Sequence, residues 1–112
     1  MNTTISLKDF LKVEMRVGTI LTAEHFIEAH NPSYKLTIDF GEYGIRKSSA
    51  QITKHYEPEA LIGTQVIAVL NFPPKQIANI MSACLVLAAL DENEEAILLQ
   101  PEKKVKNGSR IG

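Results

Sequence analysis

The sequence has a single cysteine, no tryptophan and no long apolar run. One cysteine cannot form an intramolecular disulfide, which excludes a small secreted domain held together by disulfide bonds. No stretch approaches the roughly 20 consecutive apolar residues that a membrane-spanning helix needs, and the first ten residues lack the basic and apolar segments of a signal peptide. We therefore predict a cytoplasmic protein with no membrane span.

An excess of charge of either sign is also lacking, since 12 basic residues stand against 13 acidic ones and the net charge is -1. This balance excludes a polybasic nucleic-acid arm, so any nucleic-acid surface requires cations that are segregated in space. The chain of 112 residues, 45% of them hydrophobic, predicts one domain over residues 1–112. Two domains would each have about 60 residues or fewer, a size at which burial of apolar surface is marginal.

Residue types that support catalysis or metal binding are scarce as well. The histidines, none of which has a partner at helical spacing, are His25, His30 and His55. Cys84 lies in an apolar run and is expected to be a small buried side chain rather than a nucleophile. The acidic residues cluster at 91–95, where we expect a solvated turn. The sequence predicts no enzyme activity, no metal site and no cofactor.

Alternation of apolar and polar residues predicts a series of short strands. Residues 34–40 alternate strictly, so their apolar members should share a buried face: Tyr34, Leu36, Ile38 and Phe40. Residues 13–26 alternate too, and Gly18 within them predicts a bulge or sharp bend. Residues 66–70 are continuously apolar, which indicates a strand buried on both faces. Further strands are expected at 45–52, 83–90 and 96–100.

Two short helices accompany these strands. Ser6 and Asp9 have the spacing of a capping box for a helix at the N-terminus, although so short a helix frays unless it packs on something. Pro58 and Gly63 frame a second helix between the third and fourth strands. This order of elements predicts an all-β OB-fold, a five-stranded barrel with a short N-terminal helix and a C-terminal extension. The turn at 107–108 predicts a small hairpin in that extension.

Several longer motifs carry a resemblance to a known family. They are RVGTI at 16–20, YKLTIDFG at 34–41 and NFPPK at 71–75 leading to Ser82. Together they resemble the tRNA-binding domain family of OB-folds, whose members include EMAP II-like proteins and domains appended to methionyl-tRNA synthetases. Residues 48–54, 65–74 and the closing NGSRIG are similar to the CsaA-like branch of that family.

The resemblance implies a homodimer that binds tRNA by shape and phosphate contacts, without catalysis. It also implies that residues 1–12 and 100–112 are dimerisation extensions. The apolar side chains expected to form the interface are Leu7, Phe10, Leu11, Val105 and Ile111. The CsaA-like branch has been associated with chaperone activity and protein export, so binding of unfolded peptides or preproteins is a competing interpretation.

The expected tRNA site combines cations with short hydrogen-bonding side chains on the second and third strands and the loops that border them. OB-folds bind single-stranded nucleic acid on this face. The predicted residues are Lys35, Arg46, Lys47, Ser49, Gln51, Lys54, Asn71, Lys75 and Ser82. Two other interpretations stay open: the lysines can belong to a solvated strand face, and Asn71 and Ser82 can make turn or strand-end hydrogen bonds.

The predicted loop at 73–81 carries one cation, Lys75, and is otherwise rich in apolar residues, which favours the peptide interpretation. Asn79 stands where relatives usually have glycine, and asparagine tolerates the left-handed backbone conformation. Asn79 can therefore replace that glycine in a left-handed conformation.

Overall fold

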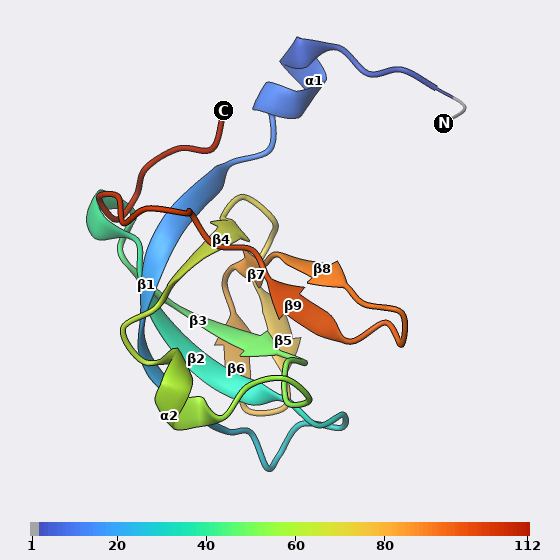
Figure 1. Cartoon of the computed structure of the whole chain (residues 1–112), viewed down its shortest axis with the longest axis vertical. Coiled ribbons are helices and arrows are strands. Elements are labelled where there is room, and N and C mark those ends of the chain that lie inside the picture. The colour runs from blue at the N-terminus through green and yellow to red at the C-terminus, as the bar shows by residue number, and fades with distance from the viewer. Residues whose placement is uncertain (1–2) are drawn as a thin grey trace.

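Five short antiparallel strands curl into a nearly closed barrel in the computed structural model, which describes residues 3–112 (Figure 1). The strand order is β3-β2-β1-β4-β7. The bounds are β1 (Met15–His25), β2 (Tyr34–Asp39), β3 (Ile45–Ala50), β4 (Gln65–Val69) and β7 (Leu85–Val86). The predicted all-β barrel is confirmed, and β2 begins at the predicted residue.

Two small hairpins lie beside this sheet: β5 (Lys75–Ile77) with β6 (Ile80–Ser82), and β8 (Ala88–Leu90) with β9 (Ala96–Leu98). The predicted loop at 73–81 is therefore the β5–β6 hairpin. In its turn Ala78, rather than Asn79, has the positive φ, of 47°. The predicted strand at 83–90 divides at Leu87, whose N–H donates to Ile67 while its carbonyl accepts from Leu99.

Hydrogen bonds between β3 and residues 82–84, at the end of β6 and just after it, close the barrel. The Ala83 N–H donates to the Lys47 carbonyl over 2.9 Å, and the Ser49 N–H donates to Ser82 Oγ over 3.3 Å. The Ser48 hydroxyl is buried and donates to the Cys84 carbonyl over 3.2 Å. These bonds give partners to backbone groups along the free edge of β3. They also hold the β5–β6 hairpin next to β3.

The core lies under the alternating face of β2. Its side chains are at most 2% exposed at Tyr34, Leu36, Ile38 and Phe40, as predicted. Gly18 lies directly over this core, since a Cβ there would stand 2.6 Å from the Phe40 ring and 2.7 Å from Ile38. The register shift in β1 falls between Ile20 and Thr22. Gly18 therefore allows close packing, and its predicted role as a bulge was wrong.

Both predicted helices are present as α1 (Leu7–Leu11) and α2 (Pro58–Leu61). The capping box is confirmed, with the Asp9 N–H donating to Ser6 Oγ over 3.0 Å and the Ser6 N–H donating to Asp9 Oδ2. No residue of α1 is buried, and the helix projects away from the barrel (Figure 1). A short 3-10 turn, η1 (Gly41–Tyr43), joins β2 to β3. None of the described helices is long and apolar enough to cross a membrane.

The C-terminal extension pairs with the first half of β1, so the predicted terminal hairpin was wrong. The Val17 N–H donates to the Ser109 carbonyl over 3.0 Å, and the Gly108 N–H returns a bond to Val17 over 2.8 Å. Pairing of β1 with β2 begins only at Thr19, so this part of β1 has an edge that the extension can satisfy. Gly108 has a φ of 91° and approaches the Phe40 carbonyl too closely for a Cβ.

The turn at 91–95 is held by Asp91. One carboxylate oxygen accepts from the N–H groups of Asn93 and Glu95 over 2.8 and 2.9 Å, and the other lies 2.8 Å from His55 Nε2. The backbone N–H of Glu95 and then the His55 side chain lower the pKa of Asp91 below its ordinary value of 3.8. A lowered folded pKa means that ionised Asp91 stabilises the fold above that ordinary value and loses this effect as the pH falls.

We therefore expect Asp91→Asn to lower the melting temperature at pH 7 and to lower it much less at an acid pH below the lowered pKa of Asp91, where the natural carboxylate is protonated too. Thermal unfolding followed by circular dichroism at the two pH values measures both differences. An equal difference at both pH values would contradict the ionic role of Asp91.

Candidate nucleic-acid interface

Adjacent residues of β3 face opposite sides of the barrel wall, and this separates the predicted cations. In the β2–β3 register, Lys47 lies opposite Thr37 and Ser49 lies opposite Lys35, all on the outer face. Arg46 lies opposite the buried Ile38, on the other side. The outer face therefore carries Lys35, Lys47 and Ser49 together.

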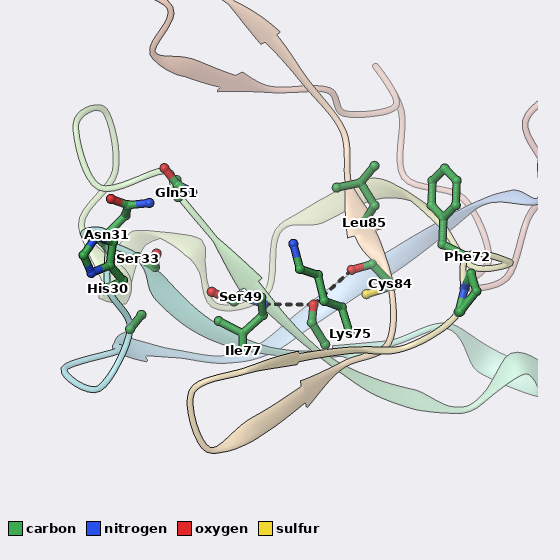
Figure 2. A pocket seen from close by; sticks show the side chains of 13 residues that line it. His30, Asn31, Ser33, Ser49, Gln51, Phe72, Lys75, Ile77, Cys84 and Leu85 are labelled. Carbon is green, nitrogen blue, oxygen red and sulfur yellow. Dashed lines mark hydrogen bonds between the residues drawn. The ribbon is translucent and has the colours of Figure 1, made fainter.

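A cleft of about 510 Å³ lies over this outer face, between the 29–33 loop, the end of β3 and the β5–β6 hairpin (Figure 2). Four predicted tRNA contacts line it: Ser49, Gln51, Lys75 and Ser82. The structure thus brings together residues from three separate parts of the chain. Ser49 and Ser82 are already joined by a hydrogen bond at its floor.

The charge in this cleft comes from Lys75. It is the only lining residue with a formal charge at pH 7 when histidine is counted as neutral, and the salt bridges within residues 3–112 leave it unpaired. Burial raises the pKa of the Cys84 thiol at the floor to about 11, so the thiol stays neutral. The cleft therefore offers one free cation among uncharged hydrogen-bonding groups, which is an arrangement that attracts an anion.

A second cleft of about 800 Å³ adjoins the first and runs between residues 49–54 and the β8–β9 hairpin. Lys54 lines it, but so do Glu94 and Glu95. The predicted tRNA contact at Lys54 is therefore separated from Lys75 and faces carboxylates that offset its charge. Anion binding is favoured in the first cleft rather than here.

Besides Ser82, three predicted tRNA contacts have structural partners. Arg46 Nη1 donates to the carbonyls of Leu70 and Ala83 over 3.0 and 3.2 Å. Lys35 forms a salt bridge with Glu24, with 3.5 Å between Lys35 Nζ and Glu24 Oε1. The Asn71 side chain accepts from the Glu14 N–H over 2.9 Å and donates to the Lys12 carbonyl over 2.6 Å. Contact of these three with tRNA stays a prediction, and Arg46 and Asn71 have a positioning role in the fold.

Asn71 thus ties the segment after α1 to the end of β4. We expect Asn71→Ala to lower the free energy of unfolding by about 1 kcal/mol, because two largely exposed hydrogen bonds are lost. Urea denaturation measures this change in stability. Binding of tRNA at two salt concentrations measures whether Asn71 also contacts the RNA. An unchanged midpoint with weaker tRNA binding at both salt concentrations would contradict the positioning role and favour a direct contact between the Asn71 amide and the RNA.

The prediction from sequence missed one wall of the cleft. His30, Asn31 and Ser33 line it from the loop between β1 and β2. In the sequence, Asn31, Pro32 and Ser33 are typical of a turn, which indicates only a connection between strands. The available signal was the fold itself, because loops between the strands of an OB-fold border its binding face.

Comparison with known proteins places the chain in a family. The family model described as "Putative tRNA binding domain" matches residues 15–110. The chain belongs to the tRNA-binding domain family. Methionine–tRNA ligases of Methanococcoides burtonii and Helicobacter pylori are 40% and 38% identical to it over 107 residues. These alignments cover 96% of the chain but only 16% of each ligase, so the tRNA-binding domain corresponds to a small part of these curated relatives.

Solved structures of similar chains confirm the fold and the predicted likeness to the CsaA branch. Chaperone CsaA from Bacillus anthracis is 48% identical, with a TM-score of 0.92 that covers 98% of this chain and 100% of the other. CsaA chaperone protein from Picrophilus torridus is 45% identical, with a TM-score of 0.90 over 97% and 100%. A MetRS-related protein from Pyrococcus horikoshii is 27% identical, with a TM-score of 0.87 over 98% and 99%.

Proposed function

We propose that this chain is a cytoplasmic, homodimeric and non-catalytic tRNA-binding protein that recognises tRNA by shape and phosphate contacts. The observation that carries the proposal is the first cleft, which lies on the outer face of a tRNA-binding domain and has Lys75 as its one free charge. Membership of the tRNA-binding domain family supports tRNA as the partner. The charge and lining of the first cleft support the outer face of β3 as the surface that binds it.

The cations around this cleft are placed to contact phosphates along one strand of RNA. Lys75 lies opposite Ser82 in the β5–β6 hairpin, and Ser82 contacts β3 at Ser49. Lys47 is two residues from Ser49 on the same face. Phosphates are recognised by such ammonium groups, while serine hydroxyls and the Gln51 amide suit phosphate oxygens and 2′-hydroxyls.

Retention of total tRNA on a filter at about 50 and about 200 mM salt tests the proposal. Three or more phosphate contacts should make binding roughly tenfold or more weaker at the higher salt, because counterions released on binding must be recaptured. Binding that is absent at low salt, or equal at both concentrations, would contradict tRNA as the partner.

Dimerisation is supported by the N-terminal helix. Leu7 is 72% exposed and Leu11 43% exposed on α1, a helix of five residues that is marginal alone in water. Helix α1 and the C-terminal end of the chain lie on the same side of the barrel (Figure 1). Phe10 and Ile111 are half-buried and Val105 is 39% exposed, so all five predicted interface residues retain accessible apolar surface. Residues 1 and 2 of the predicted extension lie outside the described part of the chain.

We expect the natural chain to sediment at twice its subunit mass of 12.4 kDa and the double variant Leu7→Glu, Leu11→Glu to sediment as a monomer. Two carboxylates in an apolar interface would be desolvated without partners. Ile27→Glu is the matched control, because Ile27 is 88% exposed in a loop away from α1. A natural chain that is monomeric at micromolar concentration would contradict the proposal.

A second candidate function, capture of unfolded peptides, is favoured by the second cleft. Leu85 and Leu90 in its wall are 50% and 65% exposed, and Glu94 and Glu95 line it too. Apolar walls with carboxylates suit an extended peptide that carries apolar and basic residues, such as a preprotein segment. Salt distinguishes the two functions, because apolar capture holds or strengthens as salt rises while phosphate binding weakens.

A further inference from the structure

The first cleft presents three kinds of group along its length (Figure 2). The amides of Asn31 and Gln51 lie toward one end, Lys75 reaches into the middle, and Phe72 lies at the opposite end. We propose that this cleft holds an unpaired segment of the bound RNA, with a base edge on the two amides and a phosphate on Lys75. This inference rests on the proposed tRNA binding and names the part of the RNA that the cleft takes.

The size and floor of the cleft suit a nucleotide that has left its helix. Its volume of about 510 Å³ lies in the range of about 300–1,000 Å³ typical of small-molecule pockets. Its lining includes apolar side chains of Ile77 and Leu85 beside the buried Cys84, against which the flat face of a base can pack. A base in a paired helix presents neither its face nor its Watson–Crick edge to such a pocket.

The amides in the cleft are free to read a base. Across residues 3–112, the side chains of Asn31 and Gln51 have no hydrogen-bond partner in the chain. Each amide has two N–H donors and one carbonyl acceptor, which matches the mixed donors and acceptors on the edge of an unpaired base. Because Gln51 is uncharged, its contribution should not depend on salt.

The remaining groups complete the set that single-stranded binding needs. Phe72 is 56% exposed, so its ring is accessible for a second base to stack on, and stacking accepts any base. Lys75 is free of ion pairs within the described chain and supplies the phosphate contact. The peptide backbone is uncharged, whereas an RNA backbone carries a phosphate at every nucleotide for Lys75 to contact. The cleft also has no carboxylate lining it that could pair with a basic side chain of a peptide. The observations therefore favour RNA here.

Binding of two fluorescent hexanucleotides, hexauridylate and hexaadenylate, to the full chain at low salt tests the inference. We expect both to bind, to compete with tRNA, and to bind about tenfold more weakly to Gln51→Leu with an unchanged salt dependence. Gln100→Leu is the matched control, since Gln100 is exposed and lines a separate depression of about 210 Å³.

The outcomes separate this inference from the proposed function. Hexanucleotides that neither bind nor displace a tRNA that does bind would overturn the inference and leave tRNA binding in place. Equal affinities of the Gln51→Leu and Gln100→Leu variants for the hexanucleotides would overturn it as well. Failure of both tRNA and the hexanucleotides to bind would overturn the inference together with the proposed function.

Discussion

Replacement of both Lys47 and Lys75 by glutamine should weaken tRNA binding by about tenfold and reduce the slope of affinity against salt by roughly two, one for each lost phosphate contact. The two lysines lie on neighbouring segments, because the Lys47 carbonyl accepts from Ala83, one residue after the strand that pairs with Lys75. Both side chains are exposed, so the fold should be retained. Filter binding at several salt concentrations measures the affinity and the slope together.

The matched control removes the same charge elsewhere. Lys103 and Lys104 are exposed in the C-terminal extension, outside the first cleft. The double variant Lys103→Gln, Lys104→Gln has the same net charge as the first one and should keep most of the affinity. If both double variants weaken binding equally, general charge rather than the outer face of β3 controls tRNA binding, and the proposed place of binding is wrong.

Gly18→Ala should strongly lower the free energy of unfolding, because the added methyl group would enter the packed core. The new Cβ would lie 2.6 Å from the Phe40 ring, and Phe40 is fully buried. Close-packed interiors relax little, so overpacking costs about 1–3 kcal/mol and occasionally more. Urea denaturation should therefore show a lower midpoint with an unchanged slope.

A double-mutant cycle tests the cause of this loss. Phe40→Leu removes the ring that the new methyl group meets, so the combination with Gly18→Ala should be more stable than the sum of the two single changes predicts. The coupling should be at least about 1 kcal/mol. Strict additivity, or a Gly18→Ala variant within about 0.5 kcal/mol of the natural chain, would mean that β1 does not press against Phe40.

Local rules predicted the elements of the fold well. Strict alternation located β2 and its buried face, and the capping pair Ser6 and Asp9 located α1. The same rules failed at the β5–β6 hairpin, because its positive φ falls on Ala78, a residue without turn propensity. They also failed at the C-terminus, where the partner of the turn is β1, more than 80 residues earlier in the chain.

The candidate site was predicted only in part, for two physical reasons. The cleft joins the 29–33 loop, β3 and the β5–β6 hairpin, and no local pattern predicts that these segments meet. Grouping Arg46 with Lys47 overlooked the period of two along a strand, which the sequence already contained. Alternation with the buried Ser48 and Ala50 would have assigned Arg46 to the inner side and left Lys47 outside.

Mapping of amide chemical shifts in the ¹⁵N-labelled chain during titration with tRNA at low salt tests the account most directly. We predict that the perturbed residues gather around the first cleft, in the 29–33 loop, at 47–51 and at 72–82, and that the shifts reverse when salt is raised. Perturbations confined to the second cleft or to the C-terminal extension, with the β5–β6 hairpin unchanged, would contradict it.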